Sequence, residues 1–107
     1  LNKARRSCRE ILKFTKNNRT ALPDALLLQG RYEWLRGKRS AAMRWWDKAL
    51  EESRRLKDPY MEGMIHLEIG RRTRDREHLQ LAESILGEIG AEFDLAAARD
   101  ALANAAG

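Results

Sequence analysis

The sequence contains no valine, three threonines and two prolines among its 107 residues. The β-branched side chains that β-strands favour are therefore scarce. Alanine, leucine, arginine and glutamate, which favour helices, dominate instead. This composition predicts an all-α fold without a β-sheet.

Long apolar runs are also missing, since no stretch approaches the roughly 20 apolar residues that a membrane-spanning helix needs. The first residues, Leu1–Ala4, lack the charged-then-apolar layout of a signal peptide. The single cysteine, Cys8, cannot form an internal disulfide, which favours a reducing compartment. We therefore expect a cytoplasmic protein without membrane contact, and a chain that opens on leucine indicates a fragment of a longer parent.

Sites for nucleotides and metal ions find no support in the sequence. A phosphate-binding loop needs a first glycine and a closing hydroxyl residue, but Tyr32 and Arg39 stand at these positions around Gly37. His66 and His78 lie twelve residues apart on different predicted helices, and neither has a second ligand four residues later in the sequence. We interpret His66 as a partly buried packing residue and His78 as a surface residue, and we expect no cofactor and no metal ion.

Catalytic residues are equally absent from the pattern. A cysteine nucleophile needs a nearby base, and Cys8 has no histidine close to it in the sequence. The carboxylates Asp47, Glu51 and Glu52 alternate with basic residues, as surface ion pairs do, and no apolar pocket is indicated for them. We therefore expect a protein that is not an enzyme.

Helical periodicity and local signals divide the chain into six segments. Pro23 and Pro59 suit the first turn of a helix, and Asp58, Asp75 and Asp94 are expected N-caps. Glycines at 37 and 90 are expected to end helices. We expect helices over about 2–17, 23–36, 39–57, 59–72, 76–89 and 94–105.

An internal repeat is the strongest feature of the sequence. Residues 23–57 align with 63–97 at an offset of forty residues. The alignment matches small and apolar positions, namely Gly30 with Gly70, Ala42 with Ala82, Trp46 with Leu86 and Ala49 with Ile89. Such a recurrence predicts a helical-repeat protein.

These residues resemble the tetratricopeptide repeat. Gly30, Ala42, Trp46 and Ala49 stand where that family places a small residue, an alanine, a large apolar residue and a second small residue. The second copy follows the pattern until Ile89, which is large where a small residue is usual, and the family's period is shorter than forty. The resemblance implies antiparallel helix pairs stacked as a short right-handed solenoid of about six helices. A single domain over 1–107 then consists of the second helix of a preceding pair (1–17), two repeats (23–57 and 59–89) and a capping helix (94–105).

A larger part of the chain, residues 21–102, resembles the C-terminal helical repeats of large bacterial regulators. Such regulators combine a STAND-type AAA ATPase with a nucleotide cyclase or protein kinase output domain. The segment that resembles them contains no ATPase domain, so the resemblance implies no ATPase activity here. It implies a fragment of a signalling regulator that acts as an interaction or scaffold module.

The resemblance also implies a binding surface, because the first helix of each tetratricopeptide pair lines a concave groove. Arginine and tryptophan, which often anchor interfaces, occur on the corresponding face. The alternative is that Trp34 packs against the preceding helix and that the arginines are solvated. The candidate groove residues are Asp24, Leu27, Arg31 and Trp34 from the first repeat and Met64, Leu67, Arg71 and Arg74 from the second.

Positive charge is concentrated in the first forty residues, which hold eleven Lys/Arg and three Asp/Glu. With Tyr32 and Trp34 interleaved, this half offers an alternative function, nucleic-acid binding through phosphate contacts and base stacking. The favoured partners are a protein or peptide, including other domains of the parent chain. We also expect the apolar stripe of residues 1–17 to promote self-association of the fragment.

Overall fold

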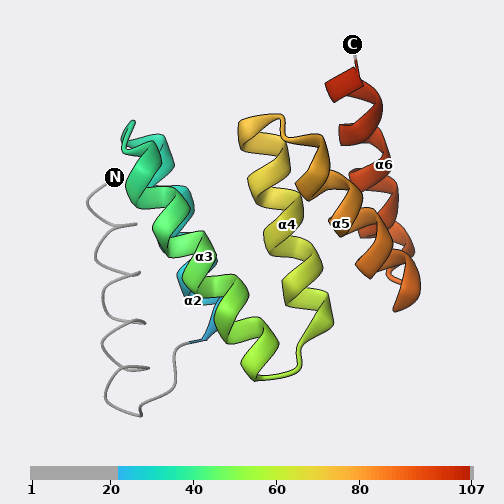
Figure 1. Cartoon of the computed structure of the whole chain (residues 1–107), viewed down its shortest axis with the longest axis horizontal. Coiled ribbons are helices and arrows are strands. Elements are labelled where there is room, and N and C mark those ends of the chain that lie inside the picture. Colours follow the sequence, from blue (N-terminus) through green and yellow to red (C-terminus); the bar gives the residue numbers. More distant parts are fainter. Residues whose placement is uncertain (1–21, 107) are drawn as a thin grey trace. The chain divides into compact units, whose positions relative to one another are not determined.

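The structure is a computed structural model that describes residues 22–106 (Figure 1). Within this range it contains five α-helices and no β-strand, which confirms the all-α prediction for the described part of the chain. The helix predicted over 2–17 lies outside the described residues. The helices are α2 (Pro23–Leu35), α3 (Arg39–Arg55), α4 (Pro59–Thr73), α5 (Arg76–Glu88) and α6 (Glu92–Ala106).

The chain divides into two compact units between Ser53 and Arg54. In its described part, the N-terminal unit consists of α2 and most of α3. The C-terminal unit contains α4, α5 and α6. None of the described helices has the length and apolar character needed to cross a membrane.

Local signals start the helices largely as predicted. Pro23 and Pro59 occupy the first turns of α2 and α4. The Asp58 carboxylate accepts a hydrogen bond from the Met61 N–H (3.1 Å), and Asp75 caps α5 in the same way through the N–H of residue 77 (3.0 Å). These bonds satisfy N–H groups that have no partner inside the helix.

The predicted N-cap at Asp94 is wrong, because α6 begins at Glu92 and Asp94 lies in its first turn. Its Oδ2 instead accepts a hydrogen bond from the Tyr60 hydroxyl (2.9 Å), which ties the first turn of α4 to the first turn of α6. This bond also raises the pKa of Tyr60 above its usual value, because the neutral hydroxyl is the donor.

Two of the helices end at the predicted glycines. Gly37 has φ +80°, its N–H donates to the Trp34 carbonyl (2.9 Å), and the Lys38 N–H donates to the Glu33 carbonyl (2.9 Å). The same two bonds recur at Gly90 (φ +74°), whose N–H donates to the Gly87 carbonyl while the next N–H donates to the Leu86 carbonyl. This arrangement is the Schellman motif, in which the left-handed residue is usually glycine.

The core of the N-terminal unit is built around Trp46, whose side chain is fully buried. Its Nε1 donates a hydrogen bond to the Leu27 carbonyl (3.1 Å), so the buried indole has no unsatisfied donor. A Cβ at Gly30 would lie 2.5 Å from Cδ1 of the indole, so only glycine leaves room for the ring there. Ala42 and Ala49, one turn to each side of Trp46, are fully buried as well.

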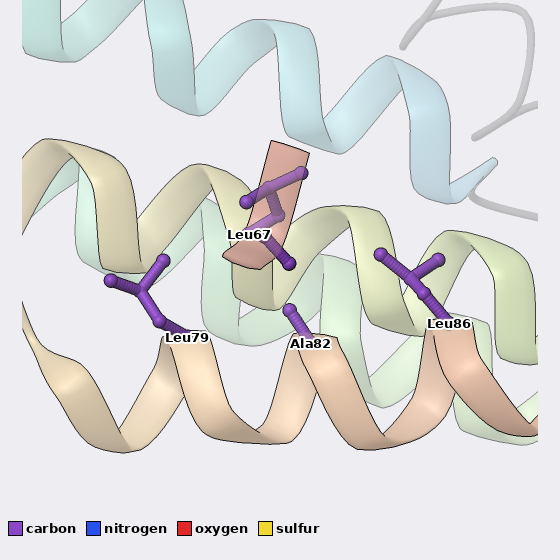
Figure 2. Close-up of a cluster of buried hydrophobic side chains, with 5 residues drawn as sticks. Leu67, Leu79, Ala82 and Leu86 are labelled. Atoms are coloured by element: carbon purple, nitrogen blue, oxygen red, sulfur yellow. The ribbon is translucent and has the colours of Figure 1, made fainter. Parts of the chain in front are cut away.

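The core of the C-terminal unit is a cluster that joins α4, α5 and α6. Figure 2 shows three of its side chains, from α5, directed toward α4. Two glycines of α4 permit this approach: a Cβ at Gly70 would lie 2.6 Å from Leu79, and one at Gly63 would lie 2.9 Å from Leu86. The buried members of the cluster are Leu67, Leu79, Ala82, Leu86 and Ala98.

Candidate functional site

A pocket of about 300 Å³ lies within the C-terminal unit, where the end of α4, the start of α5 and the second half of α6 meet. Its volume is at the lower end of the range for ligand sites, roughly 300–1,000 Å³. Basic, acidic and amide side chains surround it, and small apolar residues fill the rest of its wall. The lining residues are Gly70, Arg71, Arg74, Leu79, Ala97, Asp100, Ala101, Asn104 and Ala105.

Small residues on α6 are the reason that the pocket exists. Ala97, Ala101 and Ala105 follow one another at steps of four, so they share one face of the helix. Longer side chains at these positions would fill the space above Leu79, which is itself buried. The pocket therefore combines an apolar wall with a polar rim.

The rim draws on the arginine-rich segment at the end of α4, whose members have different roles. Arg72 pairs with Glu68 (Nε to Oε2, 2.8 Å), and Arg76 donates to the Leu102 carbonyl (3.1 Å). Arg71 and Arg74 are exposed, and neither forms an ion pair with a carboxylate of the described residues. Two guanidinium groups are therefore available to an anionic group that enters the pocket.

Arg74 also has an unusual backbone conformation. It ends α4 in the left-handed region (φ +58°), although it is not glycine. An L-residue pays about 1–2 kcal/mol for this conformation. Such strain is common where a side chain has a functional position.

Among the groove residues predicted in the second repeat, Arg71 and Arg74 line the pocket together. Met64 is half-buried and packs against the hydrophobic cluster. Leu67 is only 2% exposed and is a core residue. The structure thus brings two of the four predicted residues to one site and assigns Leu67 to the core of the unit.

The four groove residues predicted in the first repeat all lie on α2, in the N-terminal unit. Asp24 is exposed, whereas Leu27 and Arg31 are half-buried. Trp34 is half-buried too, with its ring 5.7 Å from the Trp46 ring and the Arg39 guanidinium 4.8 Å from its centroid. Both contacting residues belong to α3, so side chains of the same helix pair already cover part of the Trp34 ring.

One of the two aromatic rings predicted to stack on nucleic-acid bases is buried. Tyr32 is 7% exposed, and the Arg36 guanidinium covers its ring at 5.3 Å. Seven of the eleven basic residues of the first forty precede residue 22 and lie outside the described residues. The described residues therefore offer little of the predicted stacking surface.

Sequence reasoning missed a pair of histidines. Nδ1 of His66, on α4, lies 2.9 Å from Nδ1 of His78, on α5, and the ring centroids are 5.2 Å apart. His66 is 3% exposed and His78 is half-buried, so the prediction of His78 as a surface residue is wrong. The available signal was the position of both residues on the two arms of one antiparallel helix pair.

Burial is the main reason that the pKa of His66 falls to about 4. The nearby His78 and Arg54 also disfavour the imidazolium, and Glu62 opposes them. Arg54 and Glu62 are paired with each other (Nε to Oε2, 3.1 Å), so their charges largely cancel. His66 is therefore neutral at physiological pH.

A metal ion would need further ligands beside these imidazoles. Among residues 22–106, no three histidine, cysteine, aspartate or glutamate side chains are grouped so that they could hold one.

Comparisons of the chain with protein-family models, with curated proteins and with solved structures gave no match.

Proposed function

We propose that this chain is a non-catalytic interaction module that binds a protein or peptide partner. In this proposal its helices form antiparallel pairs of the tetratricopeptide type, stacked as a short right-handed solenoid of about six helices. The module belongs to a larger cytoplasmic signalling regulator, and other domains of the same parent are candidate partners.

The spacing of the helices supports the repeat assignment. The helices α2, α4 and α6 begin at Pro23, Pro59 and Glu92, which are 36 and 33 residues apart. These intervals bracket the tetratricopeptide period of about 34 residues more closely than the forty-residue offset of the aligned small residues does. The two figures differ because Gly30 lies seven residues after the start of α2, whereas Gly70 lies eleven residues after the start of α4.

The pocket with Arg71 and Arg74 on its rim is the observation that carries the binding proposal. Guanidinium groups bind carboxylates through charge-assisted, often bidentate hydrogen bonds. In this proposal an acidic side chain of the partner binds the arginines, and the apolar part of the partner covers Ala97 and Ala101 in the same pocket. Burial of that apolar wall then adds to the electrostatic attraction.

An array of short acidic, neutral and basic peptides, probed with the full chain, tests this proposal. We expect acidic peptides to bind and the double variant Arg71→Glu/Arg74→Glu to bind them at least about tenfold more weakly, because each lost charged hydrogen bond costs roughly 1.5–3 kcal/mol. Arg44→Glu/Lys48→Glu is the matched control, since it makes the same charge change, from two positive to two negative side chains, at exposed residues of the N-terminal unit. Equal binding of acidic and basic peptides, or equal losses in the double variant and the control, would contradict the proposal.

A further inference from the structure

The two histidines form the one imidazole–imidazole contact of the described residues, and its geometry depends on protonation. With 2.9 Å between the two Nδ1 atoms, one ring must donate its N–H to the lone pair of the other. This hydrogen bond requires a single hydrogen between the two Nδ1 atoms. When both rings are imidazolium, both Nδ1 atoms carry hydrogen, so the hydrogen bond is lost and two positive charges face each other.

Among the charged groups that act on His66, Glu62 alone favours its imidazolium. His66 is almost completely buried. The charged groups that act on it are His78 from α5, Arg54 from the end of α3 and Glu62 from its own helix. Because Glu62 is already paired with Arg54, its carboxylate is not free to become the counter-ion of an imidazolium. A second proton therefore destabilises the folded arrangement.

The pair lies next to the residues that hold α4 and α5 together. Leu67 follows His66 in the sequence and Leu79 follows His78, and both leucines belong to the buried cluster (Figure 2). Leu79 also lines the pocket, as does Gly70, against which it packs. Separation of the two rings would therefore disturb the cluster and the pocket wall at once.

We propose that the His66–His78 pair is an acid-sensitive latch, which holds α4 against α5 at neutral pH and opens the pocket-bearing unit on acidification. The direction of the pH dependence follows from the number of protons that the folded and the unfolded chain bind. In the unfolded chain His66 regains its ordinary affinity for protons, so the unfolded state binds more protons than the folded state between about pH 6.5 and pH 4. The latch is closed above this range and weakens as the pH falls through it. Control of partner binding by the latch rests on the proposed function, whereas the opening itself does not.

Nuclear magnetic resonance of the full chain tests the latch directly, because the chain has only two histidines. We expect the ring signals of His66 to titrate well below pH 6. Amide hydrogen exchange of α4 and α5, corrected for intrinsic rates, should show opening that increases roughly 20-fold from pH 7 to pH 5. A titration of His66 near pH 6.5 would overturn the proposal, as would an opening that does not change with pH.

Variants separate the latch from general acid denaturation. Asparagine places a hydrogen-bonding atom close to the Nδ1 position but does not titrate, so we expect His66→Asn to reduce the increase in opening to less than about twofold. If His66→Asn does not fold, His78→Asn serves instead. It removes the like charge that faces His66, so the pKa of His66 should rise and the increase in opening should become smaller. Acid sensitivity that is unchanged in these variants would overturn the latch.

The tryptophans provide an internal control, because Trp34, Trp45 and Trp46 all lie in the N-terminal unit. We expect tryptophan fluorescence to stay constant from pH 7 to pH 5 while α4 and α5 open. Binding of the array's acidic peptides at both pH values distinguishes the two proposals. If no peptide binds at pH 7 but α4 and α5 open on acidification, the proposed function fails and the latch stands. If peptides bind and the opening of α4 and α5 does not change with pH, the latch fails and the proposed function stands.

Discussion

The two helix pairs α2/α3 and α4/α5 solve the same packing problem with different side chains. In each pair a glycine in the first helix lets a large side chain of the second helix approach its backbone. At Gly30 this side chain is the single indole of Trp46, anchored by a hydrogen bond to the Leu27 carbonyl. At Gly70 and Gly63 it is a leucine each time, Leu79 and Leu86.

The difference lies in how the buried volume is distributed. In the N-terminal unit the fully buried indole lies next to two alanines, and Leu26, Leu50 and Tyr32 are buried as well. In the C-terminal unit three leucines and two alanines, from three helices, share the buried cluster. A forty-residue alignment matches Trp46 with Leu86, but the glycine opposite Leu86 is Gly63 rather than Gly70. The two pairs therefore share a principle of close approach more than a set of equivalent contacts.

Truncation of the indole should have the largest effect on stability. We expect Trp46→Ala to destabilise the N-terminal unit by about 3–5 kcal/mol, because it removes a buried ring and leaves a cavity. Leu86→Ala should cost the C-terminal unit about 2–4 kcal/mol, since the other leucines remain. Urea unfolding measured by hydrogen exchange separates the two units. Trp45→Ala is the control, since Trp45 is half-buried and should cost less; a larger loss for Trp45→Ala than for Trp46→Ala would contradict the central position of the indole.

Filling the space above the glycines should have the next largest effect. We expect Gly30→Ala and Gly70→Ala each to destabilise their unit by roughly 1–3 kcal/mol through overpacking, although alanine is the better helix former. Gly87→Ala is the matched control in α5, because the nearest atom to its Cβ would be Leu95 Cδ1 at an ordinary 3.8 Å. There the change should stabilise the unit by up to about 1 kcal/mol. Thermal unfolding measures all three, and a stabilising Gly30→Ala would show that the indole can move aside.

The turns should respond least. Gly37→Ala and Gly90→Ala place an L-residue in the left-handed conformation in open space, and each should cost about 1 kcal/mol. Lys57 follows α3 with φ +54°, so Lys57→Gly should instead be neutral or stabilising by a few tenths of a kcal/mol. Differential scanning calorimetry can compare the three variants. Opposite signs for the glycine and lysine positions are expected, and equal signs would contradict the role of the left-handed residue.

Helix boundaries could be predicted because their signals are local. Pro59, Asp58 and Asp75 act within a few residues of their own helix, and Gly37 does so through two backbone bonds. Asp94 carries the same side chain as the true caps, but its partner is Tyr60, 34 residues earlier in the sequence. No local pattern encodes that contact.

The candidate site was predicted only in part, for a related reason. The resemblance to the tetratricopeptide repeat named Arg71 and Arg74 together, but the alanine face that opens the pocket belongs to α6 and becomes relevant only after packing. The histidine pair likewise depends on the offset between α4 and α5. Ile89 illustrates the opposite error, because the repeat alignment matched it with Ala49, which is fully buried, and yet Ile89 is 41% exposed just after the end of α5.

The most direct test of the binding site is a map of amide chemical shifts while the full chain is titrated with an acidic peptide selected on the array. We predict that the shifts concentrate at the pocket, around Arg71, Arg74, Ala101 and Asn104, and that they disappear in Arg71→Glu/Arg74→Glu. A map centred on α2 and α3, with no change at these pocket residues, would contradict the assignment of partner binding to the C-terminal unit.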